Sequence, residues 1–159
     1  MTFDGLPAHP LLVHAVVVLL PLAAGALVLH TLWPAARRRL GVVTPLLALV
    51  VVALVPVTIK AGEDLARNFG ANPAVARHEQ LGKQVLPWAI ALFVLAAVQW
   101  WWGGPGERVL VGADGAPTGV RRSVHVALAV LAVVAAVGAT VVLVRAGDAG
   151  ARATWGGLG

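Results

Sequence analysis

Residues 124–144 read VHVALAVLAVVAAVGATVVLV and contain no Asp, Glu, Lys or Arg. About 20 mostly apolar residues are needed to cross the hydrocarbon core of a bilayer, which is roughly 30 Å thick. Backbone groups inside lipid find no water to bond with, so an uncharged segment of this length forms a helix, whose backbone hydrogen bonds are internal. This stretch therefore predicts a membrane-spanning helix.

Three other stretches have the same character, and together the four predict an integral membrane protein. They cover residues 11–32, 40–59 and 85–102, again without Asp, Glu, Lys or Arg. Only 12% of the 159 residues are charged, whereas about 25% is usual in soluble domains. No basic residue precedes the first stretch, which we interpret as a retained helix and not a signal peptide. We expect an all-α fold with one domain over residues 6–155, a four-helix transmembrane bundle.

Basic residues near the ends of the spans predict the orientation of the chain, because cytoplasmic connections carry an excess of them. The first and third connections hold one set, and the second connection and the C-terminal tail hold the other. Each set has six members, so the count alone decides nothing. The triplet Arg37–Arg39 directly follows the first helix, which usually dominates. We therefore expect both termini to lie outside the cell membrane of a bacterium, an origin that the content of Ala, Val, Leu, Gly and Arg indicates.

The connection after the second span is the most polar part of the chain. Residues 58–68 are expected to continue the second helix beyond the membrane. Asn72 and Pro73 then predict a helix start, with Asn72 as the N-cap and Pro73 at the first helical position. Glu79 and Lys83 are four residues apart, in the order that favours an ion pair on a helix.

The third connection is rich in Gly and predicts a different local structure. Residues 108–111 and 117–120 flank Asp114-Gly115, a dipeptide typical of tight hairpin turns. We predict a small cytoplasmic β-hairpin between the third and fourth helices. Ser123, the only serine, is expected to cap the fourth helix.

Missing residue types exclude several kinds of chemistry. The chain has no Cys, which rules out disulfides, iron–sulfur clusters and thiolate metal sites. Its net charge of +5 is interpreted as a topology signal and as attraction to the membrane surface, not as a nucleic-acid interface. No nucleophile–base pair and no Gly-rich phosphate loop stand out, so the sequence does not favour an enzyme.

Histidine carries most of the remaining chemistry, since ionisable groups within spans are functional candidates. On this topology His9 and His14 lie at the outer end of the first helix, and His78 lies near the outer end of the third. The helix face of His14 continues through Val18 and Gly25. Because Gly lets a neighbouring helix approach closely, we expect this face to look into the bundle.

Carboxylates are expected beside these imidazoles. Glu63 and Asp64 lie on the outer extension of the second helix. Imidazole together with carboxylate suits zinc or another divalent first-row metal, although the spacing matches no local metal motif. The alternative is a set of ordinary interfacial histidines beside a solvated, charged connection.

At the inner end, His125 begins a stripe of small residues that continues through Ala129, Ala132, Ala136 and Ala139. Such a stripe favours close helix packing. Next to a His it also suits a planar haem b, whose iron commonly takes an axial His. We therefore treat His125 as a secondary candidate.

His30 lies at a similar depth, but sixteen residues after His14, which places the two on roughly opposite faces of one helix. We expect His30 to reach the interface beside Trp33. Two stacked bis-histidine haems, one on His14 and His78 and one on His30 and His125, would be the boldest hypothesis. Two points argue against this hypothesis. His14 and His78 are expected at unequal depths in the membrane, and the helix face of His30 is not expected to point toward His125.

Four segments carry a resemblance to a known family. Residues 9–14 read HPLLVH, residues 61–63 read AGE, residues 78–82 read HEQLG, and residues 147–155 read GDAGARATW. In order, they resemble the H-P-x-x-V-H signature, the segment after the second helix, the H-E-x-L-G segment and the C-terminal G-H-x-G-A-x-x-x-W segment of small bacterial membrane proteins called domain of unknown function 2231. The resemblance covers nearly the whole chain, from Leu6 to Trp155.

The resemblance implies four helices and a His-rich cluster on the outer face, but no established activity. One position departs from the family pattern, because Asp148 stands where the family tends to place His. A carboxylate there would suit zinc, but not a bis-histidine haem that uses this residue. The complete candidate cluster is then His9, His14, Glu63, Asp64, His78 and Asp148.

Three functions remain open. Small size, short connections and the lack of a catalytic motif favour a non-enzymatic subunit or accessory protein of a larger membrane complex, or a protein that associates with itself. A metal- or b-haem-binding protein in electron transfer is the second hypothesis, based on the histidines and acids of the outer side. A pathway for protons or small solutes is the third, and the absence of acids from the spans disfavours it.

Overall fold

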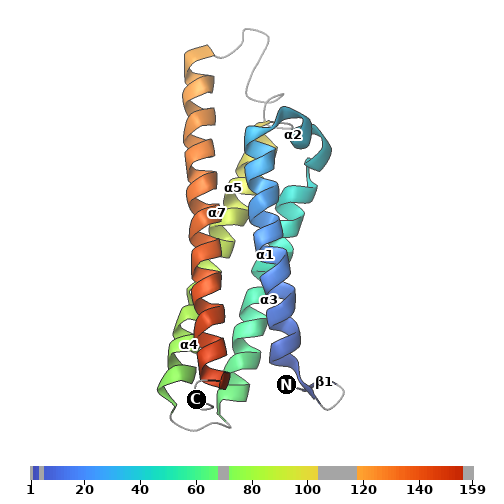
Figure 1. Cartoon of the computed structure of the whole chain (residues 1–159). Helices are drawn as coiled ribbons and strands as arrows, with labels where there is room; N and C mark the ends of the chain where they lie inside the picture. Colours follow the sequence, from blue (N-terminus) through green and yellow to red (C-terminus); the bar gives the residue numbers. More distant parts are fainter. Residues whose placement is uncertain (1, 4–5, 68–71, 104–117, 156–159) are drawn as a thin grey trace.

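In the computed structural model, the described residues 2–3, 6–67, 72–103 and 118–155 are almost entirely helical (Figure 1). The helices are α1 (Ala8–Leu32), α2 (Pro34–Leu40), α3 (Val43–Ala66), α4 (Pro73–Lys83), α5 (Val85–Trp102) and α7 (Thr118–Trp155). Two short strands, β1 (Thr2–Phe3) and β2 (Leu6–Pro7), pair antiparallel ahead of α1.

Four long apolar helical segments confirm the predicted spans, and the chain is a multi-pass membrane protein. They are Ala8–Leu32, Val43–Ala66, Pro73–Trp102 and Arg122–Trp155. Because α2 separates the first two spans, the second begins at Val43 and not at the predicted Leu40. The third is built from α4 and α5, which meet at Gln84.

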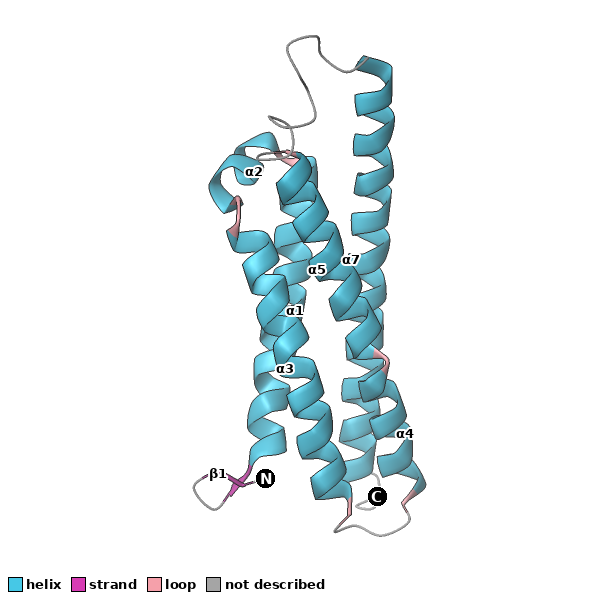
Figure 2. Cartoon of the chain, turned by 180° about the vertical axis from the view of Figure 1, so that it is seen from behind, coloured by secondary structure: helices cyan, strands magenta, loops and turns pink. Residues whose placement is uncertain are grey.

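The spans lie side by side, and each end of the bundle gathers different elements (Figures 1 and 2). α1 packs against α3 and α7, α3 against α5, and α4 against α7. At one end, called the His9 end below, α1 begins, α3 and α7 end, and α4 lies beside them. At the opposite end, called the Arg37 end, lie α2, the end of α5 and the start of α7.

Apolar side chains fill the interior and also cover the outside of the helices. Leu20, Leu27 and Leu92 are at most 1% exposed and lie in the core. On the outer surface, Val18 and Val144 are each 64% exposed. Soluble proteins rarely expose such side chains in large contiguous patches, whereas lipid tails are as apolar as these residues. These surfaces therefore face the bilayer.

The inward face of α1 is not the predicted one. Its buried residues are Val16, Leu20, Ala23, Ala24, Leu27 and His30. His14, Val18 and Gly25 are exposed instead, and nothing lies within 4 Å of the position of a Cβ on Gly25. The small residues that this helix buries in the core are Ala23 and Ala24.

His30 is consequently buried in the bundle, and the prediction that it reaches the interface beside Trp33 is wrong. The residue is 2% exposed, and its Nδ1 lies 3.5 Å from Oγ1 of Thr44 on α3. Arg37 of α2 folds back over the end of α1 and donates from Nε to the carbonyl of His30 at 3.1 Å. The expectation that His14 and His30 lie on opposite faces is confirmed, because one is exposed and the other buried.

The small-residue stripe of α7 faces the bundle, as predicted. Ala132, Ala136 and Ala139 are buried. Gly138 lies beside them, and the ring of Trp88 on α5 occupies the space where a Cβ on Gly138 would stand. His125 itself is exposed, so the packed part of the stripe begins beyond it.

The predicted hairpin between the third and fourth spans gains no support. Residues 108–117 lie outside the described residues, and Thr118–Val120 form the first turn of α7 instead of a strand. Ser123 also lies inside α7, where its Oγ donates to the carbonyl of Gly119 at 3.1 Å. Ser123 therefore does not cap the helix, because a helix that has formed extends at little cost beyond its apolar stretch.

The predicted start of α4 is confirmed. The side chain of Asn72 accepts a hydrogen bond from the backbone N–H of Ala74 at 2.9 Å, and Pro73 occupies the first turn. Nζ of Lys83 lies 2.7 Å from Oε1 of Glu79, so the predicted ion pair also forms.

Gly138→Ala tests the fit between α5 and α7. A methyl group at this position collides with the ring of Trp88, and overpacking of this kind typically costs about 1–3 kcal/mol. We expect Gly138→Ala to lower the unfolding temperature of the detergent-purified protein, measured by Trp fluorescence. Gly25→Ala is the matched control, because its methyl group meets nothing within 4 Å. Equal unfolding temperatures for the two variants would contradict this packing.

Candidate functional site

A cavity of about 560 Å³ lies at the His9 end between α1, α3, α4 and α7. This volume is typical of sites for small molecules and cofactors. Most of the residues that line it are apolar. The polar ones are His9, His14, Thr58, Asn72, His78, Glu79 and Thr154. We call this space the histidine cavity.

His9 is held by the neighbouring helix α3. Its Nδ1 lies 3.0 Å from the carbonyl oxygen of Thr58. A carbonyl oxygen only accepts, so Nδ1 carries the hydrogen, and in the neutral ring Nε2 has the free lone pair. The ring lies against Gly62, where a Cβ would stand 2.8 Å from Cε1 of His9. The position of this imidazole therefore depends on a residue without a side chain.

His78 is held in the same way by α7. Its Nδ1 lies 2.8 Å from the carbonyl oxygen of Ala146 and donates to it. A Cβ on Gly150 would stand 3.0 Å from both Cε1 and Nδ1 of the ring. The same tautomer follows, with Nε2 as the nitrogen that can bind a ligand.

The two histidines share one local arrangement. In each case the accepting carbonyl stands four residues before the glycine, Thr58 before Gly62 and Ala146 before Gly150. Four residues are about one helical turn. Because Cα–Cβ bonds tilt toward the start of the helix, a side chain at the later position would lie over the carbonyl. Glycine leaves the carbonyl open to an imidazole from the next helix.

His9 and His78 meet in the histidine cavity although they come from α1 and α4. Their ring centroids are 6.0 Å apart, and the ring planes are inclined by 77°. His14 also lines the cavity, but it is exposed, and its Nδ1 lies 2.6 Å from the carbonyl oxygen of Pro10 in its own helix. All three imidazoles thus bind a backbone carbonyl through Nδ1 and leave Nε2 for a ligand.

The acidic members of the predicted cluster do not join the histidines. Each lies next to a basic side chain: Glu63 to Lys83 at 2.9 Å, Asp64 to Arg67 at 3.7 Å and Asp148 to Arg152 at 3.1 Å. None of the three acids lines the histidine cavity. Within the described residues, no group of three or more His, Asp or Glu side chains is placed to hold a metal ion.

Sequence reasoning missed four residues that position the imidazoles. They are Thr58 and Ala146, whose carbonyl oxygens accept the hydrogen bonds from Nδ1, and the two glycines, Gly62 and Gly150. A backbone acceptor leaves no mark in a sequence, because every residue has one. The glycines did leave a signal, since an isolated Gly in a helical stretch often has a packing or functional reason.

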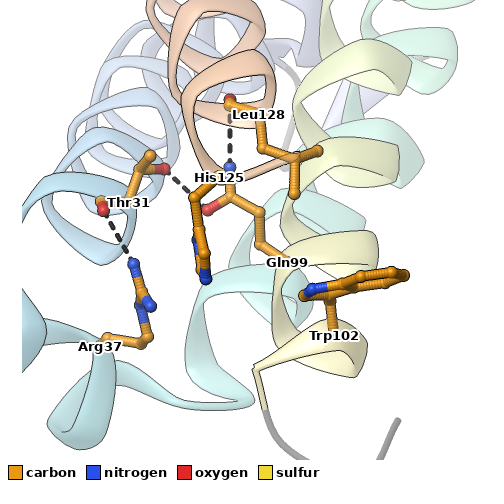
Figure 3. A pocket seen from close by; sticks show the side chains of 6 residues that line it. All are labelled: Thr31, Arg37, Gln99, Trp102, His125 and Leu128. Atoms are coloured by element: carbon orange, nitrogen blue, oxygen red, sulfur yellow. Dashed lines mark hydrogen bonds between the residues drawn. The ribbon is translucent and has the colours of Figure 1, made fainter. Parts of the chain in front are cut away.

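A second polar site lies at the Arg37 end and joins α1, α2, α5 and α7 (Figure 3). Oγ1 of Thr31 donates to Oε1 of Gln99 at 2.7 Å, and Nε2 of Gln99 donates to the carbonyl of Leu128 at 3.4 Å. Nη2 of Arg37 donates to the carbonyl of Thr31 at 2.9 Å, and His125 completes the lining. The space is about 10 Å³, which is room for about one water molecule and not for a haem.

No family model matches the chain, and neither a curated protein nor a solved structure matches it. The chemistry of the histidine cavity is therefore derived from its own residues. Its distinguishing feature is a pair of imidazoles fixed through Nδ1 by two different helices.

Gly150→Ala tests whether glycine positions His78. The added methyl group would stand 3.0 Å from the ring, so the ring must move away from the carbonyl of Ala146. We expect nitrogen NMR of histidine-labelled protein to show that the protonated Nδ1 signal of His78 is lost. Gly147→Ala on the same helix is the control, because its methyl group meets nothing within 4 Å. If both variants keep the signal, glycine does not set the position of this ring.

Proposed function

We propose that this membrane protein is a non-enzymatic subunit that holds a metal-containing group in the histidine cavity. The observation that carries the proposal is the shared arrangement of His9 and His78, each of which donates Nδ1–H to a helix carbonyl. Histidines that bind metals almost always donate their other N–H to such a partner, which fixes the tautomer and makes the ligand nitrogen more basic. In the histidine cavity both imidazoles have such a partner, His9 on α3 and His78 on α7.

The space beside the two rings supports binding over a purely structural role. A His that only joined two helices would need no open volume next to it, yet about 560 Å³ lies there. Among the described residues, no hydrogen bond is made by Nε2 of His9 or of His78. An apolar cavity with a few polar groups is typical of cofactor sites.

We assign the histidine cavity to the outer side of a bacterial cell membrane, with both termini outside. The triplet Arg37–Arg39 supports this orientation, because it lies in α2, at the end of the bundle opposite the cavity. Arg122 lies near the start of α7 at that same end. The His9 end also carries basic residues, so the orientation rests on the triplet that directly follows the first span, which usually dominates the placement of the cytoplasmic side.

The packing of the core argues against a pathway for protons or solutes. Leu20, Leu27, Val51 and Leu92 are fully buried in the core. The apolar stretches that contain them hold no Asp, Glu, Lys or Arg. An apolar layer therefore separates the His9 end from the Arg37 end.

Association with other membrane proteins, or with further copies of the chain, is the subunit part of the proposal. The short connections leave little of the chain outside the membrane, so partners would meet the lipid-facing surfaces of the helices. Pull-down from mild detergent, followed by determination of mass, tests this part. Recovery of a single chain without partners would count against it.

Metal analysis of the native protein tests the binding role. We expect a stoichiometric amount of a transition metal in protein purified from membranes in mild detergent. His9→Ala and His78→Ala should each lower the affinity for the metal at least tenfold. Removing only the hydrogen-bond partner of a metal ligand already lowers metal affinity about 10–100-fold. His125→Ala, at the Arg37 end, is the control and should keep the metal. Wild-type protein without stoichiometric metal would refute the binding role.

Single cysteine variants test the orientation, since the chain has no Cys of its own. Trp155 is 67% exposed at the His9 end, and Gly119 is exposed at the Arg37 end with nothing within 4 Å of its Cβ position. We expect a membrane-impermeant maleimide to label Trp155→Cys in intact cells and Gly119→Cys only after permeabilisation. The opposite labelling pattern would reverse the orientation.

A further inference from the structure

We infer that the group held in the histidine cavity is haem b, with its iron bound between His9 and His78. The inference rests on the proposed function, that these imidazoles hold a metal-containing group, and identifies the group. The number of donors, the separation of the two rings and the surroundings of the cavity all point to this cofactor.

The number of protein donors in the histidine cavity is too small for a simple metal ion. Zinc sites take three or four protein ligands, and within the described residues no set of three suitable side chains is placed to hold an ion. Haem supplies the equatorial nitrogens of its iron, so the protein needs to provide only axial ligands, which are commonly His. His9 and His78 are sufficient for haem and insufficient for zinc.

The distance between the two imidazoles fits one iron between them. Their ring centroids are 6.0 Å apart. Two imidazoles on opposite sides of a metal, each bound through a nitrogen at about 2 Å, have centroids roughly 6 Å apart. Nδ1 of His9 is held by α3 and Nδ1 of His78 by α7, which leaves Nε2 of each ring as the nitrogen that can bind the iron.

The lining of the cavity suits a flat, mostly apolar ring system. Val13, Val16, Val55, Ile59 and Leu143 contribute to the walls, from three helices. Helical bundles commonly build cofactor sites in this way, from side chains on facing helices. A volume of about 560 Å³ lies well within the range of cofactor pockets.

The charge at the His9 end suits the propionates of haem. Among the described residues, six basic side chains lie at this end against four acidic ones. They are Lys60, Arg67, Arg77, Lys83, Arg145 and Arg152, against Glu63, Asp64, Glu79 and Asp148. None of these basic side chains lines the cavity itself, but their excess of two positive charges at this end favours a group that carries two carboxylates.

His14 is excluded as an axial ligand and provides the matched control. It lines the same cavity and also uses Nδ1 on a carbonyl, but that carbonyl belongs to Pro10 of its own helix, and the side chain is exposed. Among the described residues, no hydrogen bond from a second helix fixes its ring. The same His-to-Ala change at His14 therefore removes an imidazole from the cavity without removing a ligand of the iron.

The experiment compares haem content and spectra of the wild-type protein with His9→Ala, His78→Ala and His14→Ala. Cells are supplied with δ-aminolevulinate so that haem is not limiting, and each protein is purified in mild detergent by size exclusion. We expect stoichiometric haem b with a six-coordinate, low-spin spectrum in the wild type. His9→Ala and His78→Ala should lose haem about tenfold or become high-spin, whereas His14→Ala should keep the low-spin spectrum.

Other outcomes separate failure of this inference from failure of the proposed function. Stoichiometric zinc in place of haem, lost in His9→Ala, overturns haem and leaves the metal-binding role intact. If His9→Ala and His78→Ala both retain haem with an unchanged spectrum, the assignment of these two residues as axial ligands is overturned. Protein without haem and without any stoichiometric metal overturns both proposals.

A measurement on the wild-type protein covers the case in which the ligand variants do not fold. Electron paramagnetic resonance of the oxidised protein distinguishes ferric haem with two imidazole ligands from five-coordinate haem. The low-spin signal of two imidazoles supports the assignment to His9 and His78. A high-spin signal in the wild type overturns it.

Discussion

The hydrogen bonds from Nδ1 of His9 to the carbonyl of Thr58, and from Nδ1 of His78 to the carbonyl of Ala146, hold the histidine cavity in its shape. Each bond joins two helices at the His9 end, α1 to α3 and α4 to α7. A carbonyl oxygen has two lone pairs, so it can accept an imidazole N–H without giving up its bond within the helix. The bundle therefore gains two fixed imidazoles without breaking the backbone hydrogen bonds that lipid requires at these two carbonyls. The polar site at the Arg37 end differs, because the space beside Thr31 and Gln99 is only about 10 Å³, the size of about one water.

The four spans could be predicted from the sequence because membrane crossing imposes a strong and local rule, the absence of charge over about 20 residues, although the second begins at Val43 and α7 begins before Ser123. The inward face of α1 could not. Lipid tails are as apolar as Leu, so inward and outward faces of a membrane helix have similar composition. The sequence placed His14 and His30 on opposite faces correctly, but Gly25 suggested the wrong one. The structure buries the face of His30 and leaves Gly25 exposed.

For the candidate site, the sequence predicted that His9, His14 and His78 come to the same end, and they line one cavity. It did not predict which imidazoles meet, because that depends on how α4 packs against α7. The acids were expected to act as ligands because carboxylates and imidazoles share metals. Nearby basic side chains hold them instead, as Lys83 holds Glu63. Such pairing depends on distances between helices, which local spacing does not encode.

The central claim is that His9 and His78 present their Nε2 atoms to a shared metal-containing group. An experimental structure of the protein purified from its native membrane tests this most directly. The account predicts density for a metal centre between the two rings, with each Nε2 at about 2 Å from it and each Nδ1 still on its helix carbonyl. Nε2 atoms that face only water, or rings turned away from Thr58 and Ala146, would contradict it.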